Sequence, residues 1–287
     1  MIYADLHCDT ATLMYDKQLN FNSKIHLNHK ALKAYDILYQ CFAIFFNDTV
    51  KNGGMEYFEK VLAYFLPLVK EEKNIVPFIT IEGGDVLEGR LENLDRLREA
   101  GVRIFGLVWN GENDLAVGAQ TNNAEGLRPL GIKCVQRLEE LNILPDVSHL
   151  SDKGFFDVVE NCKGRFVATH SNSRKIYPNL RNLTDEQIDI IISRDGLIGL
   201  NLYPPFVAEN AHIKDVLKHV DYFLQRGAEN TLCFGCDLDG IDKTPHGFSS
   251  VADVKKIIKL IKKLYGEEIA EKITYKNALR ILGGEVK

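Results

Sequence analysis

The segment Ile2-Tyr3-Ala4-Asp5-Leu6-His7-Cys8-Asp9 follows Met1 and has the composition of a buried strand. Side chains alternate between the two faces of an extended strand, so we expect His7 and Asp9 to point the same way and Cys8 to point away. One imidazole and one carboxylate at this spacing can hold a divalent cation. A buried histidine that is hydrogen-bonded to an aspartate has the same pattern, so the rest of the chain must decide.

Apolar segments typical of buried strands recur along the chain, and segments with helical periodicity separate most of them. After the first strand we expect strands at residues 37–46, 74–82, 103–109, 143–149, 165–170, 196–203 and 231–237. Eight strands without a linker or a break in composition predict an α/β fold, a single (β/α)8 TIM-type barrel domain over residues 1–287. The alternative is a doubly wound open sheet, but no glycine-rich phosphate loop follows the first strand.

Metal-ligating or titratable side chains stand at the end of most of these strands, where barrels gather their catalytic groups. In chain order they are His7 and Asp9, Glu82, Asn110, His149, His170 and Asp237. Burying so many ionisable groups together would be costly without a cation. The sequence therefore predicts a metal site at the C-terminal ends of the strands.

The mixture of imidazole and carboxylate favours Zn²⁺, and Mn²⁺, Fe²⁺ or Co²⁺ would accept the same ligands. We expect two ions per chain, one held by His7 and Asp9 and the other by His149 and His170, with Glu82 bridging them. The alternative is that each histidine is an ordinary core residue and that Glu82 is a salt-bridge partner. Five such residues at successive strand ends favour the metal site.

Several of these segments match the pattern of a known family. They are DLHCDT at residues 5–10, IEGG at 81–84, DVSH at 146–149, THSN at 169–172, Arg181-Asn182, and GCDLDG at 235–240. In these segments, in their order and in the spacing of the two later histidines, the chain resembles the membrane (renal) dipeptidase family of zinc peptidases, within the amidohydrolase-like barrels. The resemblance spans nearly the whole chain.

The resemblance implies a binuclear zinc site whose ligands are His7, Asp9, Glu82, His149 and His170, with the glutamate bridging. It also implies that Arg181 binds the free carboxylate of a dipeptide, which a guanidinium recognises well. Asp237 is expected beside the attacking water or the substrate amine. The implied activity is hydrolysis of dipeptides with a free C-terminal carboxylate, through a hydroxide that bridges two metals, with Asp237 carrying the proton to the leaving amine.

One segment departs from the family. Members such as the mammalian enzyme carry a histidine after the fourth strand, where this chain has Trp109-Asn110-Gly111. Asn110 can donate a hydrogen bond to the substrate or to a developing oxyanion, but it carries no positive charge. We therefore expect turnover or substrate preference to differ. Two alternatives stay open, namely another metal-dependent amide, lactone or ester hydrolase on the same barrel and a non-catalytic metal-binding protein.

Composition argues against several kinds of partner. The formal net charge is −5 and the pI is near 5.9, which predicts no nucleic-acid partner and no anionic membrane surface. The lysines between residues 255 and 263 alternate with apolar residues at helical spacing, as on the solvated face of an outer helix. No signal peptide or membrane span is recognisable, so we expect a cytoplasmic protein that acts on small dipeptides. A homodimer is left open.

The cysteines and two further histidines are not expected to take part in the site. The six cysteines are scattered, mostly in apolar surroundings, so we expect them to be reduced and buried. Cys233 and Cys236 form a CxxC pattern, but residues three apart in a strand face opposite ways. His26 and His29 lie in a polar segment without a partner pattern and are expected on the surface.

Overall fold

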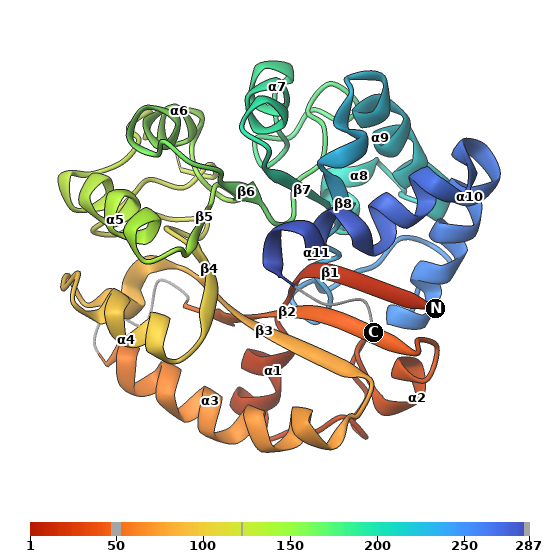
Figure 1. The fold of residues 1–287 in the computed structure, drawn as a ribbon, viewed down its shortest axis with the longest axis horizontal. Coiled ribbons are helices and arrows are strands. Elements are labelled where there is room, and N and C mark those ends of the chain that lie inside the picture. The colour runs from red at the N-terminus through yellow and green to blue at the C-terminus, as the bar shows by residue number, and fades with distance from the viewer. Residues whose placement is uncertain (47–52, 122, 284–287) are drawn as a thin grey trace.

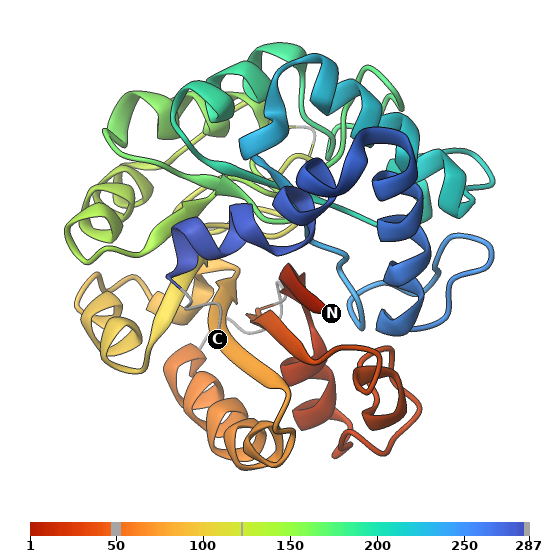
Figure 2. The same cartoon turned by 45° about the vertical axis from the view of Figure 1, so that its right-hand side comes forward.

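A computed structural model describes residues 1–46, 53–121 and 123–283. Over these residues, eight parallel strands close into a barrel in the order β1 to β8. Helices follow the strands along the chain and surround the barrel (Figures 1 and 2). The barrel is closed where β1 pairs with β8, with Asp5 opposite Phe234. The predicted α/β barrel is therefore confirmed, and the open sheet is excluded.

The first three strands are longer than the other five. They are β1 (Ile2–Cys8), β2 (Ile37–Phe45), β3 (Ile75–Glu82), β4 (Val102–Gly106), β5 (Leu144–Asp146), β6 (Val167–Ala168), β7 (Leu197–Leu200) and β8 (Leu232–Phe234). The last five are shorter than predicted. In β5 and β8 the chain leaves the ladder before it reaches His149 and Asp237, so the backbone is free to turn these side chains inward.

Helices cover the outside of the strands. The longer ones are α1 (Thr10–Asp16), α3 (Gly54–Glu71), α4 (Asn93–Glu99), α5 (Pro129–Glu140), α6 (Asp152–Asn161), α7 (Asp185–Ser193), α9 (Ile213–Gln225) and α10 (Val254–Glu271). Short segments are α2 (His29–Leu32), η1 (Gly84–Leu87), α8 (Pro204–Val207), η2 (Ala228–Asn230), η3 (Val251–Asp253), η4 (Lys272–Lys276) and α11 (Asn277–Leu282). At the start of α7, Thr184 and Gln187 form a capping box, in which each side chain accepts a hydrogen bond from the other residue's backbone N–H.

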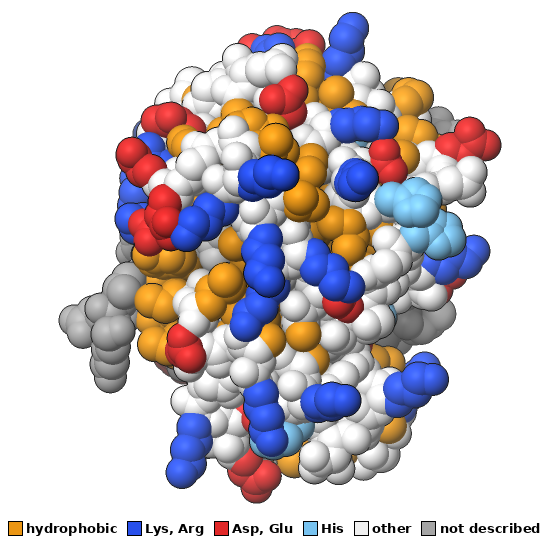
Figure 3. Space-filling model, turned by 90° about the vertical axis from the view of Figure 1, so that its right-hand side faces the viewer, with side chains coloured by type: hydrophobic (Ala, Val, Ile, Leu, Met, Phe, Trp, Pro, Cys, Tyr) orange, Lys and Arg blue, Asp and Glu red, His pale blue; other side chains and the backbone are white. Residues whose placement is uncertain are grey.

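The outer helix α10 shows how the apolar pattern becomes packing. Val254, Ile257, Ile258 and Ile261 are buried against the rest of the molecule. The lysines of the same helix point outward, and Figure 3 shows Lys and Arg side chains spread among other side chains on this face. The prediction of a solvated helix face is confirmed.

All six cysteines are buried and free, as expected. The Cys233 and Cys236 thiols have different neighbours, the carbonyl of Ile198 and the hydroxyl of Tyr3. In the part of the chain that the structure describes, no helix has both the length and the apolar character needed to cross a membrane.

Candidate metal centre

Glu82, the last residue of β3, lies in the middle of the predicted site. Its Oε1 is 2.8 Å from Nε2 of His149 and 3.8 Å from Nε2 of His170. Its Oε2 is 3.3 Å from Nε2 of His7. The two carboxylate oxygens thus face different histidines, which is the arrangement that lets one carboxylate serve two cations.

Asp9 lies on the His7 side of the centre. Its Oδ2 is 3.6 Å from Nε2 of His7, and Oδ1 of Asp237 is 3.9 Å from the same nitrogen. The strand ends at Cys8, and Asp9 is the N-cap residue of α1 with φ −96° and ψ 14°. The two side chains do converge as predicted, but the first turn of α1, and not strand alternation, brings Asp9 to His7.

The rings of His149 and His170 face each other, with their Nε2 atoms 2.8 Å apart. Their other nitrogens face oxygen atoms, because Nδ1 of His149 is 2.9 Å from Oδ1 of Asn110 and Nδ1 of His170 is 2.8 Å from Oγ1 of Thr169. A neutral imidazole that donates from Nδ1 keeps its Nε2 lone pair for a metal. Both histidines are therefore oriented as ligands.

Asp146, at the end of β5, supports both histidines from below. Its carboxylate accepts hydrogen bonds from the hydroxyl and the backbone N–H of Thr169 and from the backbone N–H of Ser148. These partners are sequence neighbours of His170 and His149. Sequence reasoning assigned no role to Asp146 or Thr169, although an aspartate inside an apolar strand is a signal of a buried polar network.

Three observations test whether these residues fit a cation. Nε2 of His7 and Oδ1 of Asp9 are buried and have no hydrogen-bond partner among the described residues, whereas buried polar atoms are nearly always paired. Gly240 leaves space beside them, since a Cβ there would overlap Oδ2 of Asp9 and lie 2.7 Å from Oδ1 of Asp237. Ligand atoms of His7, Glu82 and His170 also lie within 4.8 Å of one another. The residues present fit a divalent cation.

Burial separates the protonation states of these groups. It lowers the pKa of His149 to about 4 and the pKa of His170 well below its ordinary value. It raises the pKa of Asp9 to about 6 and the pKa of Asp237 to about 8. Two histidines are thus neutral at neutral pH, and Asp237 can exchange a proton there.

For Glu82 and His7, neighbouring charged groups outweigh the effect of burial on the pKa. Burial by itself raises the pKa of Glu82, but the nearby His7 and His149 hold it well below its ordinary value. Burial by itself lowers the pKa of His7, but Glu82 and Asp9 raise it well above its ordinary value. In the absence of a cation, His7 and Glu82 are therefore a buried charge pair.

Two site residues have a left-handed backbone, His149 with φ 72° and Asp237 with φ 62°. This conformation is uncommon outside glycine and costs about 1 kcal/mol or more per residue. Backbone hydrogen bonds hold it in place, from Ala119 to the carbonyl of His149 and from Asp237 to the carbonyl of His7. The direction of both side chains is thus fixed at the expense of backbone energy.

Asn201, just after β7, is a site residue that sequence reasoning missed. Its Nδ2 donates to Oδ2 of Asp237 over 3.1 Å and to the carbonyl of His170 over 3.3 Å, and its Oδ1 accepts from the backbone of Tyr203. The side chain is fully buried. An amide inside the apolar run 196–203 was the available signal.

Arg181 is buried at the edge of the centre and is not an exposed loop residue. Its Nη2 lies 3.0 Å from Nε2 of His170, its guanidinium carbon lies 5.5 Å from the ring centre of Phe206, and its Nε has no partner among the described residues. Burial lowers its pKa to about 10, so it remains charged at neutral pH. Its binding of a substrate carboxylate stays a prediction, as does the contact of Asn110 with substrate.

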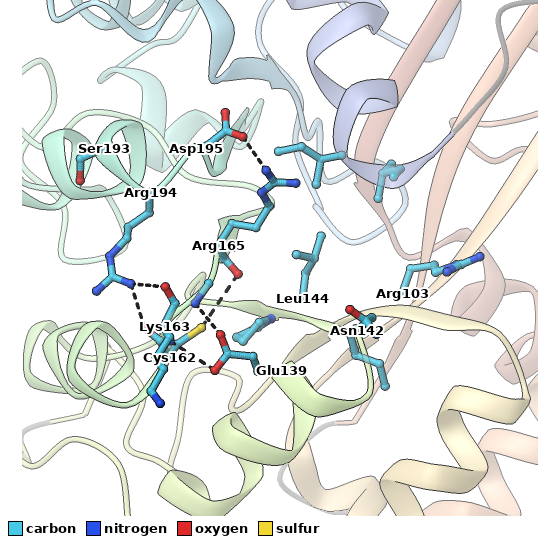
Figure 4. A pocket seen from close by; sticks show the side chains of 15 residues that line it. Arg103, Glu139, Asn142, Leu144, Cys162, Lys163, Arg165, Ser193, Arg194 and Asp195 are labelled. Carbon is cyan, nitrogen blue, oxygen red and sulfur yellow. Dashed lines mark hydrogen bonds and ion pairs between the residues drawn. The ribbon is translucent and has the colours of Figure 1, made fainter.

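Two cavities lie at opposite ends of the barrel. One of about 440 Å³ opens above the centre, and its lining includes Asp9, Glu82, Asn110, His149 and Asp237. The other, of about 660 Å³, lies near the starts of β4 to β7 (Figure 4). There Arg165 pairs with Asp195, and Arg194 donates to backbone carbonyls. Arg165 and Arg194 are thus committed to other groups, and the lining of the larger cavity includes none of the predicted site residues.

Comparison with known families supplies an identification. The family model for membrane dipeptidases, peptidase family M19, matches residues 66–286. The chain belongs to peptidase family M19. As an M19 member it is a metallo-dipeptidase, and its family implies a divalent metal. His7 and Asp9 lie before the matched residues, so their place in the site rests on the geometry above.

Two curated relatives show how far this M19 chain aligns with other proteins. It is 29% identical over 226 residues to an uncharacterised protein in the pqqA 5′ region of Klebsiella pneumoniae, which covers 74% of this chain and 83% of the relative. It is 29% identical over 217 residues to an uncharacterised dipeptidase of Schizosaccharomyces pombe, covering 72% of this chain and 53% of that one. The aligned part is thus about half of the longer relative.

Solved structures of M19 proteins share the fold. A metallopeptidase from Rhodobacter sphaeroides, liganded with a phosphinate mimic of the dipeptide L-Ala-D-Ala, has a TM-score of 0.86 and 23% identity. Dipeptidase AC, an M19 metallopeptidase, has a TM-score of 0.88 and 23% identity. Both alignments cover 98% of each chain. These likenesses confirm the barrel.

Proposed function

We propose that this M19 chain uses two zinc ions to hydrolyse dipeptides that have a free C-terminal carboxylate. The observation that carries the proposal is the position of Glu82, whose two oxygens face different histidines at 2.8 Å and 3.3 Å. Two oxygens that face different histidines allow each oxygen to meet a separate cation. The dipeptide mimic bound to the Rhodobacter sphaeroides relative supports the substrate class.

His7 and Asp9 would hold one ion with Oε2 of Glu82, and His149 and His170 would hold the other with Oε1. Two divalent ions, when bound, supply a hydroxide nucleophile at neutral pH by lowering the pKa of water to about 7, and they polarise the scissile carbonyl. The other ions that accept these ligands are Mn²⁺, Fe²⁺ and Co²⁺. Zinc is proposed because imidazole and carboxylate are its usual ligands in catalytic sites.

The protein's own groups would move the proton and orient the substrate. Asp237 can accept a proton and return it to the leaving amine, because Asn201 fixes its Oδ2 and leaves Oδ1 toward the centre. Arg181 would pair with the substrate carboxylate. Asn110 holds His149 through Oδ1, so its amide nitrogen is the atom available to donate to the substrate carbonyl.

Arg181 provides the sharpest test of substrate class. Zinc-loaded wild type and Arg181→Ala would be assayed on Ala-Ala and on its C-terminal amide, which lacks the carboxylate. We expect the substitution to lower kcat/KM for Ala-Ala by about a hundredfold, mainly through KM, and to have little effect on the amide.

Three results would contradict the proposal. Turnover in fully metal-free protein would show that the reaction needs no metal. Equal turnover of Ala-Ala and its amide would show that the enzyme does not recognise the substrate carboxylate. Hydrolysis of esters or lactones without dipeptide turnover would favour another hydrolase of the same barrel. A matched control is Arg226→Ala, which removes a partly exposed arginine paired with Asp189 on the outer helices.

A further inference from the structure

Two aromatic pairs line the cavity above the candidate metal centre. The rings of Phe45, at the end of β2, and Trp109, just after β4, have centroids 5.0 Å apart. The rings of Tyr203 and Phe206, after β7, are also 5.0 Å apart. Both pairs meet edge to face, which is a favourable geometry for aromatic rings.

The two pairs face each other across the barrel. In the closed order β1 to β8, the strand between β2 and β4 is β3, and β3 lies opposite β7. The guanidinium of Arg181 lies over the ring of Phe206, which lines the cavity, so this buried cation is on the Tyr203 side. A dipeptide whose carboxylate lies at Arg181 therefore directs its N-terminal residue toward Phe45 and Trp109.

Hydrogen bonds of the backbone hold both segments that carry the Phe45–Trp109 wall. The backbone N–H of Phe45 donates to Oγ1 of Thr12 over 2.9 Å. The loop that carries Trp109 is closed by a hydrogen bond from Gly118 to Gly111 over 2.7 Å. A wall that is already ordered loses little entropy when a side chain binds against it.

We propose that the Phe45–Trp109 wall is the subsite for the N-terminal side chain and that the enzyme prefers dipeptides with a large apolar N-terminal residue. This inference rests on the proposed dipeptidase function. A large side chain removes the exposed edges of both rings from water, whereas glycine leaves them solvated. Both aromatic rings are half-buried, so apolar surface is available to cover.

The test compares Gly-Ala, Ala-Ala, Leu-Ala and Phe-Ala on the zinc-loaded enzyme. We expect kcat/KM for Leu-Ala and Phe-Ala to exceed that for Gly-Ala by about tenfold or more, the range that apolar pockets achieve. Trp109→Ala should bring the Phe-Ala to Gly-Ala ratio close to one, and Trp109→Phe should keep most of it. Phe156→Ala, an aromatic truncation on the outer helix α6, is the matched control and should keep the full ratio.

A second measurement does not depend on turnover. Trp109 is the only tryptophan in the chain, so tryptophan fluorescence reports on this wall alone. A phosphinate analogue of Phe-Ala should shift the emission to shorter wavelength, because its side chain displaces water from the indole. The corresponding analogue of Gly-Ala should produce a smaller shift at saturation.

The outcomes separate this inference from the proposed function. If the zinc-loaded enzyme hydrolyses none of the four dipeptides, the proposed function fails and the inference falls with it. If it hydrolyses Ala-Ala without preferring Leu-Ala or Phe-Ala, the inference alone fails. It also fails if the preference survives Trp109→Ala or if both analogues shift the emission equally.

Discussion

Glu82 reaches the middle of the site because β3 stays paired to its last residue, opposite Phe45 of β2 and Gly106 of β4. The chain then turns at Gly83, where φ is 102° and a Cβ would lie 2.6 Å from the carbonyl oxygen of Phe46. Only glycine fits this turn without displacement. The segment Glu82-Gly83-Gly84 thus combines a ligand with the turn that keeps it at the rim.

Removing the charge of Glu82 should weaken metal binding at the site. We expect Glu82→Gln to bind fewer than two zinc ions per chain and to lose about a thousandfold or more in kcat, since a neutral amide cannot bridge two cations. Metal content by atomic absorption and dipeptide hydrolysis measure this. Glu72→Gln is the control, because Glu72 pairs with His29 away from the centre. Two bound ions in Glu82→Gln would show that Glu82 is no bridge.

Gly240 offers a second test at the level of one atom. A methyl group at this position would occupy the space next to Oδ2 of Asp9 and Oδ1 of Asp237. We expect Gly240→Ala to weaken zinc binding by about tenfold or more while the protein stays folded, because one carboxylate must move. Gly164→Ala is the control, since a Cβ there would meet the end of the Glu139 side chain. Unchanged affinity would mean that Asp9 is not a ligand.

Zinc binding should be coupled to proton release. The pKa of His7 is raised by Glu82 and Asp9, and burial raises the pKa of Asp9 to about 6, so protons occupy ligand atoms at mildly acidic pH. We expect zinc affinity to fall by about tenfold or more per unit as the pH drops below 6. Calorimetry in buffers of different ionisation enthalpy measures the released protons. An affinity that is constant from pH 7.5 to 5.5 would contradict this.

At the scale of elements, the sequence predicted which segments become strands better than where they end. The apolar run 165–170 indicates a strand, but β6 contains only Val167 and Ala168. Its polar end joins a side-chain network with Asp146 and Ser148, and this network replaces the strand ladder. Such replacement depends on residues about 20 positions away, so local periodicity cannot reveal it.

The loop after β8 also depends on partners that are distant in the sequence. Asp239 accepts hydrogen bonds from Thr10 Oγ1 and from the backbone N–H of His26, and its own N–H donates to Nδ1 of His26. His26 was expected to be a surface histidine without a partner, which is wrong. Its partner lies 213 residues further along the chain, and no local pattern announces it. His29, by contrast, is half-exposed and pairs with Glu72.

His219 on α9 gives a stability prediction. It is buried, its Nδ1 accepts from the backbone of Ser173, and its Nε2 donates to the carbonyl of Val207. Burial lowers its pKa to about 4, so the unfolded chain takes up a proton between pH 6.5 and 4 and the folded chain does not. The folded state therefore loses stability as the pH falls, by about 2 kcal/mol between pH 7 and pH 5.

Urea unfolding with a chelator present measures this contribution. His219→Gln should be less stable than wild type at pH 7, and the difference between the two should narrow by about 2 kcal/mol at pH 5. The chelator removes metal linkage from both proteins. A difference that stays constant with pH would show that His219 titrates normally in the folded state.

For the molecule as a whole, the barrel and the convergence of the candidate ligands at one rim were predictable for one reason. Parallel strands deliver their ends to one rim, so chain order plus the residue at each strand end is enough to assemble the site. Sequence reasoning missed Asn201, Asp146 and Thr169 because they hold other side chains and are not themselves candidate ligands. Arg181 was assigned through the resemblance alone, since nothing in its loop sequence shows that it is buried.

Metal binding should stabilise the entire barrel, because the candidate ligands come from four strands, β1, β3, β5 and β6, or their following turns. We expect chelation to lower Tm by about 2–4 °C for each kcal/mol of binding free energy removed, and a metal at a thousand times its Kd contributes about 4 kcal/mol. Differential scanning calorimetry with and without chelator measures the shift. Glu82→Gln should show a much smaller shift, and an equal shift would place the stabilising metal elsewhere.

The pairing of β1 with β8 also affects the order in which the site can form during synthesis of the chain. His7 and Asp9 are made before the groups that fix them, Leu238 for the backbone of Asp9 and Asp237 for that of His7, which follow far along the chain. A nascent chain therefore carries two ligands that no partial barrel can orient. We expect metal binding at His7 and Asp9 to wait until the segment after β8 has been made.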